Sequence, residues 1–386
     1  MTLRTAITAE PIPSHVSALD YVIRPALEQG HDVTLHASLM LRRQARDRGV
    51  RFHRAGTDWT CEPAVRRGVS EIWTTEGNAP FNRYVFGRLW PDRAEAKARD
   101  LIDAWTRARP DLVIAECSDF GAHLAAKVLG LPVLAADNGL GPVLVDLWDT
   151  DIAPALTLLH KRYGQDDAPV LPPLLTPAPV TWFYGTPPPG AREVQRTVAG
   201  ERGELPAWRD SSLRPLAARP LVYVSLGTLT TAMPELRAVV GDLYREIMAA
   251  LAAVDCDAIV SAGDLAEHLC SPDPRILVVR RVPQPALLRH ADLFVTHGGR
   301  ASLLDAVQGG TPVLGLGLLA DQPANTAAFA RLGLGRALDP TATRHEIAAA
   351  VRALLDDASC AAAVRAAGAE LARLAPLDVA ELRNGL

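Results

Sequence analysis

Short apolar runs alternate with helical patterns along most of the chain, and this rhythm limits the possible folds more than any other feature. The first half contains four strand-like runs, at residues 3–9, 32–38, 112–116 and 132–137. Helical patterns follow two of them, over 16–29 and near 119–130. Because runs that are apolar throughout are typical of parallel strands covered on both faces, the pattern predicts a doubly wound α/β sheet.

A cluster of prolines interrupts the rhythm in the middle of the chain. Eleven prolines lie between residues 169 and 220. Proline has no amide hydrogen for a sheet interior and resists helix, so we interpret this stretch as a semi-rigid linker that begins near residue 166. Beyond it the strand-like runs resume, at 221–227, 257–263, 276–280, 292–297 and 311–316. Helical patterns accompany them, near 235–253, 284–290, 300–309, 322–332 and 344–356.

The length of the chain indicates two domains. With 386 residues it is too long for one ordinary core and long enough for two. We predict an N-terminal domain over 1–205, a C-terminal domain over 206–370, and a tail over 371–386 that forms a helix, a proline break and a second helix. Two Rossmann-like, doubly wound sheets would face a cleft, and ligands would bind beyond the carboxyl ends of their strands.

The charge and the cysteines argue against several functional classes. The formal net charge is −4 and charged residues make up 22% of the chain, so nucleic acid and anionic membranes are poor candidates as partners. The five cysteines contain no CxxC pair, which favours reduced thiols over a disulfide framework or a zinc site. Glu10 and Pro11 come before a signal-peptide core could form, and no apolar run reaches the roughly 18 residues of a membrane span. We expect a cytoplasmic protein that could form a homodimer.

The segment His297-Gly298-Gly299 joins a strand-like run directly to a helical pattern. Bare backbone N–H groups at the positive end of a helix suit a diphosphate, without any metal ion. The alternative is an ordinary tight turn, in which glycine serves only to reach a positive φ.

Two further loops of the second half carry polar groups at strand ends. Ser225, Gly227 and Thr228 offer hydroxyls and amides to the same phosphates, or they form an ordinary strand-to-helix loop. The exposed backbone at Val282 and the amide of Gln284 suit the edge of a pyrimidine, or they belong to a proline-capped helix start.

Three acidic or amide side chains are placed to hold sugar hydroxyls. Asp305 lies eight residues after His297 in the helix that follows the glycine loop, where a carboxylate could grip ribose. Asp321 and Gln322 form an acid–amide pair just before a helix, and such a pair can bind vicinal hydroxyls. The simpler interpretations are a solvated helix charge for Asp305 and an N-cap for Asp321.

Residues 281–335 closely resemble the signature of family 1 glycosyltransferases, and the likeness extends weakly over the rest of the chain. These inverting enzymes of the GT-B fold include plant natural-product glucosyltransferases and bacterial antibiotic glycosyltransferases. The resemblance implies that the His297-Gly298-Gly299 segment binds the donor diphosphate. It further implies ribose contact by Asp305, donor-sugar contact by Asp321 and Gln322, a pyrimidine beside Val282 and Gln284, and a C-terminal tail that crosses back onto the first domain.

The sequence departs from the family pattern at three points. Ala301-Ser302 stands where Gly-Thr or Asn-Ser is frequent, although Ser302 keeps a small hydroxyl. Asp305 replaces the usual glutamate and is one methylene shorter, and Gly317 stands where proline is common. We include Arg300, Ala301 and Ser302 among the predicted donor-binding residues. Arg300 could reach the phosphates, the acceptor or solvent, and the sequence does not decide between them.

An inverting transfer requires a base that deprotonates the acceptor hydroxyl. His15 follows the first strand and precedes the His31 of a Gly-His-Asp-Val segment by sixteen residues, which is the spacing of the family's base histidine. A carboxylate would orient this imidazole, and Glu116, at the end of the run 112–116, matches the family's acid. Asp119 is the competing candidate, unless it only caps the following helix, and His31 itself is expected to be structural.

Aromatic residues concentrate in the segment 55–92, which otherwise looks irregular. Such rings suit a flat, apolar acceptor such as a polyketide, or they merely cover a helix face. The predicted acceptor pocket consists of Trp59, Trp73, Phe81, Tyr84 and Phe86.

The sequence therefore predicts an inverting, metal-independent glycosyltransferase of the hexosyltransferase type. It would use a TDP or UDP sugar as co-substrate, no cofactor, and a hydroxyl on a small, largely apolar natural product as acceptor. Two alternatives belong to other classes. One is a catalytically inactive homologue that acts as a binding or activating partner. The other is a nucleotide-dependent oxidoreductase, which is disfavoured because no G-x-G-x-x-G follows the first strand.

Overall fold

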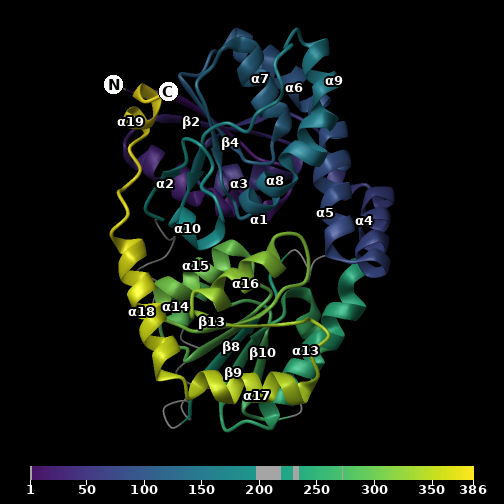
Figure 1. The fold of residues 1–386 in the computed structure, drawn as a ribbon, viewed down its shortest axis with the longest axis vertical. Helices are drawn as coiled ribbons and strands as arrows, with labels where there is room; N and C mark the ends of the chain where they lie inside the picture. Colours follow the sequence, from purple (N-terminus) through teal and green to yellow (C-terminus); the bar gives the residue numbers. More distant parts are fainter. Residues whose placement is uncertain (1, 197–218, 229–233, 272) are drawn as a thin grey trace. The chain divides into compact units, whose positions relative to one another are not determined.

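The computed structural model describes residues 2–196, 219–228, 234–271 and 273–386. The chain divides into two compact units (Figure 1). The N-terminal unit comprises Met1–Thr197 together with Leu374–Leu386, and the C-terminal unit comprises Val198–Arg373.

Within the described residues, the N-terminal unit contains a seven-stranded parallel sheet with the order β3-β2-β1-β4-β5-β6-β7. Its strands are β1 (Arg4–Thr8), β2 (Asp32–Ala37), β3 (Arg51–Arg54), β4 (Leu112–Glu116), β5 (Val133–Ala136), β6 (Leu174–Thr176) and β7 (Arg192–Glu193). The chain builds the sheet outward from β1 in one direction and then from β4 in the other. The carboxyl ends of β1 and β4 therefore mark a topological switch point, where doubly wound sheets bind their ligands.

Helices cover both faces of this sheet. The helices of this unit are α1 (Pro13–Ala18), α2 (Asp20–Glu28), α3 (Arg42–Asp47), α4 (Pro63–Glu76), α5 (Asn78–Tyr84), α6 (Trp90–Arg107), α7 (Phe120–Leu129), α8 (Gly141–Leu147), α9 (Ala153–Arg162), α10 (Val180–Phe183) and α19 (Val379–Asn384). Alternate strand residues face opposite sides. Ile7 and Ile114 belong to the core under α2, α3 and α19, whereas Ala6 and Val113 belong to the core under α6 and α7.

Among the described residues, the C-terminal unit contains a six-stranded parallel sheet with the order β10-β9-β8-β11-β12-β13. Its strands are β8 (Leu221–Ser225), β9 (Asp257–Ser261), β10 (Ile276–Val279), β11 (Leu293–Thr296), β12 (Val313–Leu316) and β13 (Gly335–Leu338). The main helices are α13 (Arg237–Ala252), α14 (Gln284–Leu288), α15 (Arg300–Gly309), α16 (Gln322–Arg331), α17 (Arg344–Leu355) and α18 (Ala358–Ala372). The prediction of two doubly wound parallel sheets is confirmed.

The tail of the chain returns to the N-terminal unit. Gln29 holds it in place, because its Nε2 donates to the Leu377 carbonyl at 2.5 Å and its Oε1 accepts from the Val379 amide at 3.0 Å. Leu377, Val379 and Leu382 are part of the core formed with α2 and β2. The last 13 residues, Leu374–Leu386, therefore complete the N-terminal unit rather than the C-terminal one.

Three predictions about local structure are wrong. The helix expected over 16–29 is two helices, because Leu19, with φ −87° and ψ 3°, leaves the helical conformation between α1 and α2. The segment 55–92 is largely helical, since Pro63 and Pro91 lie in the first turns of α4 and α6, where no amide donor is needed. The linker expected from residue 166 supplies β6 and β7 to the sheet. Its prolines flank these short strands and do not interrupt them.

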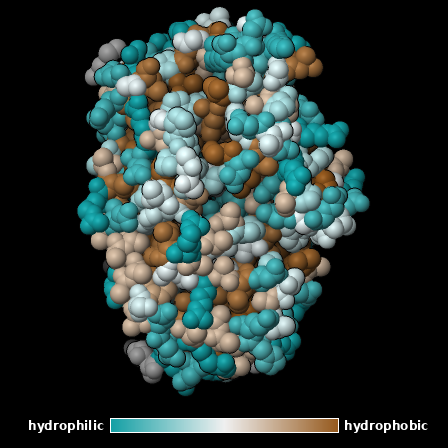
Figure 2. All heavy atoms as spheres, in the orientation of Figure 1, coloured by the Kyte–Doolittle hydropathy of each residue, from teal (hydrophilic) through white to brown (hydrophobic). Residues whose placement is uncertain are grey.

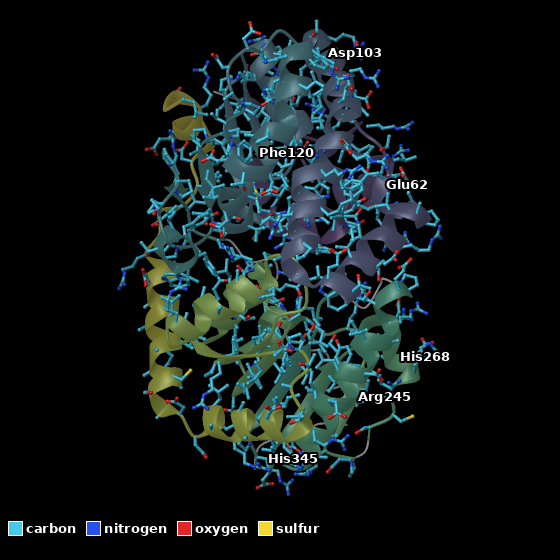
Figure 3. The ribbon with its side chains drawn as sticks, turned by 45° about the vertical axis from the view of Figure 1, so that its right-hand side comes forward. Glu62, Asp103, Phe120, Arg245, His268 and His345 are labelled. Atoms are coloured by element: carbon cyan, nitrogen blue, oxygen red, sulfur yellow. The ribbon has the colours of Figure 1, made fainter. Side chains whose placement is uncertain are left out.

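The surface is mixed in polarity. Figure 2 shows hydrophilic residues over much of the visible face, with hydrophobic residues scattered among them. Figure 3 shows the contrast between Asp103, which points outward from α6, and the buried Phe120 at the start of α7. In the part of the chain that the structure describes, no helix is both long and apolar enough to cross a membrane.

Candidate active site

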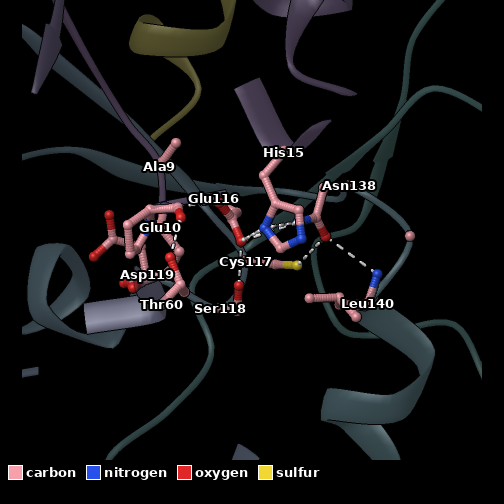
Figure 4. A network of polar contacts seen from close by, with 12 residues as sticks. Ala9, Glu10, His15, Thr60, Glu116, Cys117, Ser118, Asp119, Asn138 and Leu140 are labelled. Atoms are coloured by element: carbon pink, nitrogen blue, oxygen red, sulfur yellow. Dashed lines mark hydrogen bonds and ion pairs between the residues drawn. The ribbon is translucent and has the colours of Figure 1, made fainter. Parts of the chain in front are cut away.

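His15 and Glu116 meet at the switch point of the N-terminal sheet (Figure 4). His15 lies in α1, directly after β1, and Glu116 is the last residue of β4. The distance between His15 Nδ1 and Glu116 Oε1 is 2.7 Å. An ionised carboxylate can only accept, so Nδ1 carries the proton and the lone pair of the imidazole is on Nε2.

Glu116 is fully buried and surrounded by donors. Its Oε1 also accepts from the Ser118 hydroxyl and from Asn138 Nδ2, the latter at 2.9 Å, and its Oε2 accepts from the Glu10 amide at 2.9 Å. Burial alone would raise the pKa of this carboxyl, but His15 and the hydrogen bonds outweigh it and hold the pKa below the usual value. The carboxylate is thus kept ionised beside the imidazole.

Asp119, the alternative partner for His15, has other contacts. Its Oδ1 accepts from the Ala122 amide at 3.1 Å and so caps α7, and its Oδ2 lies 2.5 Å from Lys97 Nζ. The capping role considered from the sequence is therefore present, and Glu116 is the carboxylate that contacts His15. His31 accepts a hydrogen bond from the Leu3 amide at 3.2 Å, as a structural histidine would.

Four residues of this network were not predicted from the sequence: Glu10, Lys97, Ser118 and Asn138. Glu10, Ser118 and Asn138 each lie within two residues after a strand that ends at the switch point, so a search of these strand ends could have found them. Lys97 gives no such signal, because a lysine in an amphipathic helix normally indicates an exposed position.

The predicted acceptor residues lie in different environments. Trp59, Phe81 and Phe86 are buried, whereas Trp73 and Tyr84 are half-buried. Phe86 and Trp59 pack edge-on against Trp90, with ring centroids 4.9 and 5.9 Å away, and Trp90 in turn lies 6.2 Å from the imidazole of His15. An aromatic cluster of Trp59, Phe86 and Trp90 is thus built next to the histidine.

A separate cavity of about 310 Å³ lies between α7, α9 and the proline-rich segment. Its walls include Phe120, His123, Trp148 and His160. None of the five predicted acceptor residues is among its lining residues.

In the C-terminal unit, His297 directly follows β11, and its imidazole lies close to Gly227 and Gly299. A Cβ atom at Gly227 would come within 2.5 Å of the imidazole Nε2, and one at Gly299 within 2.7 Å, so a side chain at either position would force the imidazole to shift. Burial lowers the pKa of His297 to about 4, although a hydrogen bond with the Ser225 backbone acts in the opposite direction. The imidazole is therefore neutral at neutral pH.

The glycine loop packs closely against α16. Gly298 has a φ of +87°, and a Cβ there would collide with the Thr326 side chain. Gly317 is equally restricted, because a Cβ would lie 2.6 Å from Pro323 Cα. A proline at this position also has a Cβ and would meet the same contact.

Gln284 joins two of the other predicted donor residues. Its Nε2 donates to Ser302 Oγ at 3.2 Å and to Asp305 Oδ2 at 2.8 Å. The Tyr223 hydroxyl donates to Gln284 Oε1 at 3.3 Å and thereby fixes the orientation of the amide. The structure therefore brings Gln284, Ser302 and Asp305 together on one side of α15.

A second group surrounds the start of α16. The Gln322 Oε1 accepts from the amides of Leu318 and Leu319, at 3.2 and 3.1 Å, so this side chain shapes the loop before the helix. Asn325 Nδ2 donates to Asp321 Oδ2 at 2.5 Å, and Arg300 is buried with its guanidinium directed at Asn325.

The remaining predicted donor residues lie at the edges of these groups. Ser225 ends β8, Thr228 is exposed three residues later, Val282 is half-buried before α14, and Ala301 is half-buried in the first turn of α15. Among the described residues, no cluster of three His, Cys, Asp or Glu side chains could hold a metal ion.

Residues 197–370 match the family model described as UDP-glucoronosyl and UDP-glucosyl transferase. Over this segment the chain is similar to the family 1 glycosyltransferases. It is 28% identical to the oleandomycin glycosyltransferase of Streptomyces antibioticus over 308 residues, which cover 71% of this chain and 67% of that enzyme. It is 33% identical to the zeaxanthin glucosyltransferase of Pseudescherichia vulneris over 138 residues, which cover 36% of this chain and 33% of that enzyme.

The solved structures confirm the predicted GT-B fold. The spinosyn rhamnosyltransferase SpnG superposes with a TM-score of 0.76 at 18% identity, over 97% of each chain. That protein has been solved in complex with thymidine diphosphate and in complex with spinosyn aglycone.

Proposed function

We propose that the chain is an inverting glycosyltransferase that moves a sugar from a TDP or UDP donor to a hydroxyl of a small, largely apolar natural product. The contact between His15 and Glu116 carries this proposal, since it combines a base with the carboxylate that orients it. The side chain of His15 is 15% exposed and that of Glu116 is fully buried, so the imidazole is the member of the pair that substrate can reach.

In the proposed reaction, His15 Nε2 takes the proton of the acceptor hydroxyl while the oxygen attacks the anomeric carbon. The new C–O bond forms on the face opposite the bond to the diphosphate, which breaks and releases the nucleoside diphosphate, so the configuration inverts. Glu116 accepts from Nδ1–H throughout and stabilises the imidazolium that develops. General-base catalysis of this kind contributes roughly 10²–10⁴-fold to the rate.

The C-terminal unit would supply the donor contacts. The amides of Gly299 and Arg300 begin α15, where the helix dipole favours the negative charge of a diphosphate. The linked pair of Gln284 and Asp305 presents an amide and a carboxylate to the nucleoside, and Asp321 presents a carboxylate to the sugar. Binding by a helix end needs no metal ion.

The acceptor class is inferred from the aromatic cluster of Trp59, Phe86 and Trp90 beside His15. Rings of this kind contribute apolar contact area and suit a flat or alicyclic acceptor. The names of the related enzymes, which act on oleandomycin and zeaxanthin, are consistent with that class.

A transfer assay with one matched control tests the proposal. Purified full-length protein is incubated with TDP-glucose or UDP-glucose and a panel of macrolide, flavonoid and other polyketide-type alcohols, and products are detected by mass spectrometry. His15→Ala should abolish transfer and leave the Kd for TDP or UDP within about twofold of wild type, since His15 belongs to the other unit. His345→Ala, a change at an exposed position of α17 (Figure 3), should leave transfer unchanged. Undiminished turnover by His15→Ala would overturn the mechanism.

A further inference from the structure

A buried lysine lies behind the pair of His15 and Glu116. The side chain of Lys97, on α6, is only 6% exposed. Its Nζ donates to the Ala9 carbonyl at 2.6 Å and lies 2.5 Å from Asp119 Oδ2 and 3.8 Å from Glu10 Oε1. Because a buried ammonium group is costly without partners, this set of three oxygens compensates for the lost hydration.

These oxygens come from the two loops that carry the proposed catalytic pair. Ala9 and Glu10 lie between β1 and α1 and lead to His15, whereas Asp119 follows Glu116 by three residues. The Glu10 amide also donates to Glu116 Oε2 at 2.9 Å, so the two loops are joined there as well. One ammonium group therefore links the segment that presents the base to the segment that presents its carboxylate.

The surroundings are shaped to admit the lysine stem. A Cβ at Gly56, which has a φ of +78°, would lie 3.3 Å from the stem carbons of Lys97, and one at Gly121 would lie 3.0 Å from its Cβ and 2.6 Å from the Ala94 carbonyl. The positive φ favours glycine at position 56, and the contact with the Ala94 backbone favours glycine at position 121. The lysine stem thus packs closely against Gly56 and against Gly121 of α7.

The charges of the cluster also bear on the imidazolium that would develop on His15 during transfer. Burial, opposed by Lys97, raises the pKa of Glu10 to about 8, so this carboxyl is largely neutral at pH 7. Burial disfavours the charge on Lys97, but Asp119 and Glu10 hold its pKa above the ordinary value. Lys97 and Asp119 then neutralise each other, which leaves the charge of Glu116 for the imidazolium.

The titratable group of His36 also lies within electrostatic reach of Lys97. Burial, together with His53 and Lys97, lowers the pKa of His36 to about 3. His36 is therefore neutral over the working range of pH and does not alter the balance of charge.

We propose that Lys97 is a positioning residue for glycosyl transfer, which fixes the His15 and Glu116 loops relative to each other and cancels the charge of Asp119. The proposal rests on the proposed function, because it assigns Lys97 a role in that same reaction. It predicts that removal of the ammonium group changes catalysis and not donor binding, which belongs to the other unit.

The test compares Lys97→Met with Lys127→Met, a lysine change on α7 outside the network. Lys97→Met should lower kcat on the order of 10- to 100-fold, because small misplacements of a base have effects of this size. The Kd for TDP should stay within about twofold, and Lys127→Met should behave as wild type. Wild-type kcat in a folded Lys97→Met protein would overturn the inference.

The pH profile separates positioning and charge from a merely structural role. Lys97→Met leaves Asp119 uncompensated, so the acid limb of kcat/KM should move to higher pH as the imidazolium is stabilised. Asp119→Asn leaves Lys97 uncompensated and should move the limb to lower pH, and this variant also serves if Lys97→Met does not fold. Identical profiles in all three proteins would overturn the charge role.

The activity of His15→Ala shows whether the role of Lys97 fails or the proposed function itself fails. If wild type transfers sugar and His15→Ala does not, the proposed function stands, and a normal Lys97→Met then rejects only the role of Lys97. If His15→Ala is as active as wild type, the proposed function fails first.

Discussion

The guanidinium of Arg300 lies against the side-chain oxygen of Asn325, with Nε at 3.4 Å and Nη2 at 3.3 Å from Oδ1. A guanidinium can only donate, so this contact turns the amide nitrogen of Asn325 the other way. That nitrogen donates to Asp321 Oδ2 at 2.5 Å and to the Gly298 carbonyl at 3.2 Å. Arg300 therefore connects the glycine loop to the carboxylate proposed to hold the donor sugar.

Arg300→Met should weaken binding of the sugar part of the donor. Without the guanidinium, Asn325 loses the contact that orients its amide, and Asp321 loses a fixed donor. We expect the Kd for TDP-glucose to rise about tenfold, which corresponds to about 1.4 kcal/mol, while the Kd for TDP changes by less than about twofold. Isothermal titration calorimetry with both ligands measures the difference. An equal loss for TDP and TDP-glucose would instead indicate that Arg300 contacts the phosphates.

Glu116→Gln should reduce kcat and leave the fold intact. Glutamine keeps the shape of the side chain and can accept from His15 Nδ1–H, but it carries no charge to stabilise the imidazolium. We expect kcat to fall on the order of 10²–10⁴-fold. The control is Ser118→Ala, which removes one donor to Glu116 and keeps the negative charge. The thermal unfolding of both variants shows whether a lower kcat comes from the lost charge or from a local change of structure. Ser118→Ala should retain most of the activity, and a Glu116→Gln protein with near-normal kcat would rule out the charge effect.

Activity should survive removal of divalent cations. The proposed diphosphate site is the N-terminal end of α15, where amides and the helix dipole already favour negative charge. The initial rate of transfer, measured with and without an excess of EDTA, should be the same. A loss on chelation that added Mg²⁺ restores would contradict the helix-end model of donor binding.

The sequence identified the centre of the fold better than its edges. Strands that are buried on both faces, such as β4 and β11, begin with three or four uninterrupted apolar residues, and the predicted bounds agree with the observed ones to within one or two residues. The edge strands β3 and β13 were missed, because the exposed Arg51 and Arg336 break their apolar pattern. Strand β6 was hidden by its neighbouring prolines, which limit the length of the strand without preventing its pairing.

The candidate site shows the same limit. His15 and Glu116 were predicted because each has a definite place relative to a strand end and matches the family pattern. The roles of Lys97 and Asn325 depend on contacts with residues 88 positions and 25 positions away in the chain. No local pattern encodes such contacts, and a buried lysine in particular resembles a surface one in sequence.

Stability should decline as the pH falls from about 6.5 towards 4. Burial lowers the pKa of four histidines: to about 3 for His36, where His53 and Lys97 add to the effect, and to about 4 for His123, His160 and His297. Their folded pKa values lie below the unfolded value near 6.5, so the unfolded chain binds more protons in this window. The contribution of these histidines to the free energy of unfolding is therefore fully present above pH 6.5, and it is lost as acid protonates the unfolded state.

A difference of one unit between the folded and unfolded pKa of one group changes the free energy of unfolding by about 1.4 kcal/mol. Four such histidines together make stability depend strongly on pH. The thermal midpoint, measured between pH 7.5 and pH 4.5, should fall steadily on the acid side. His160→Leu removes one of the buried imidazoles and should flatten this dependence, whereas His345→Ala, at an exposed position, should not. A thermal midpoint that is constant down to pH 4.5 would show that these histidines are already protonated in the folded protein.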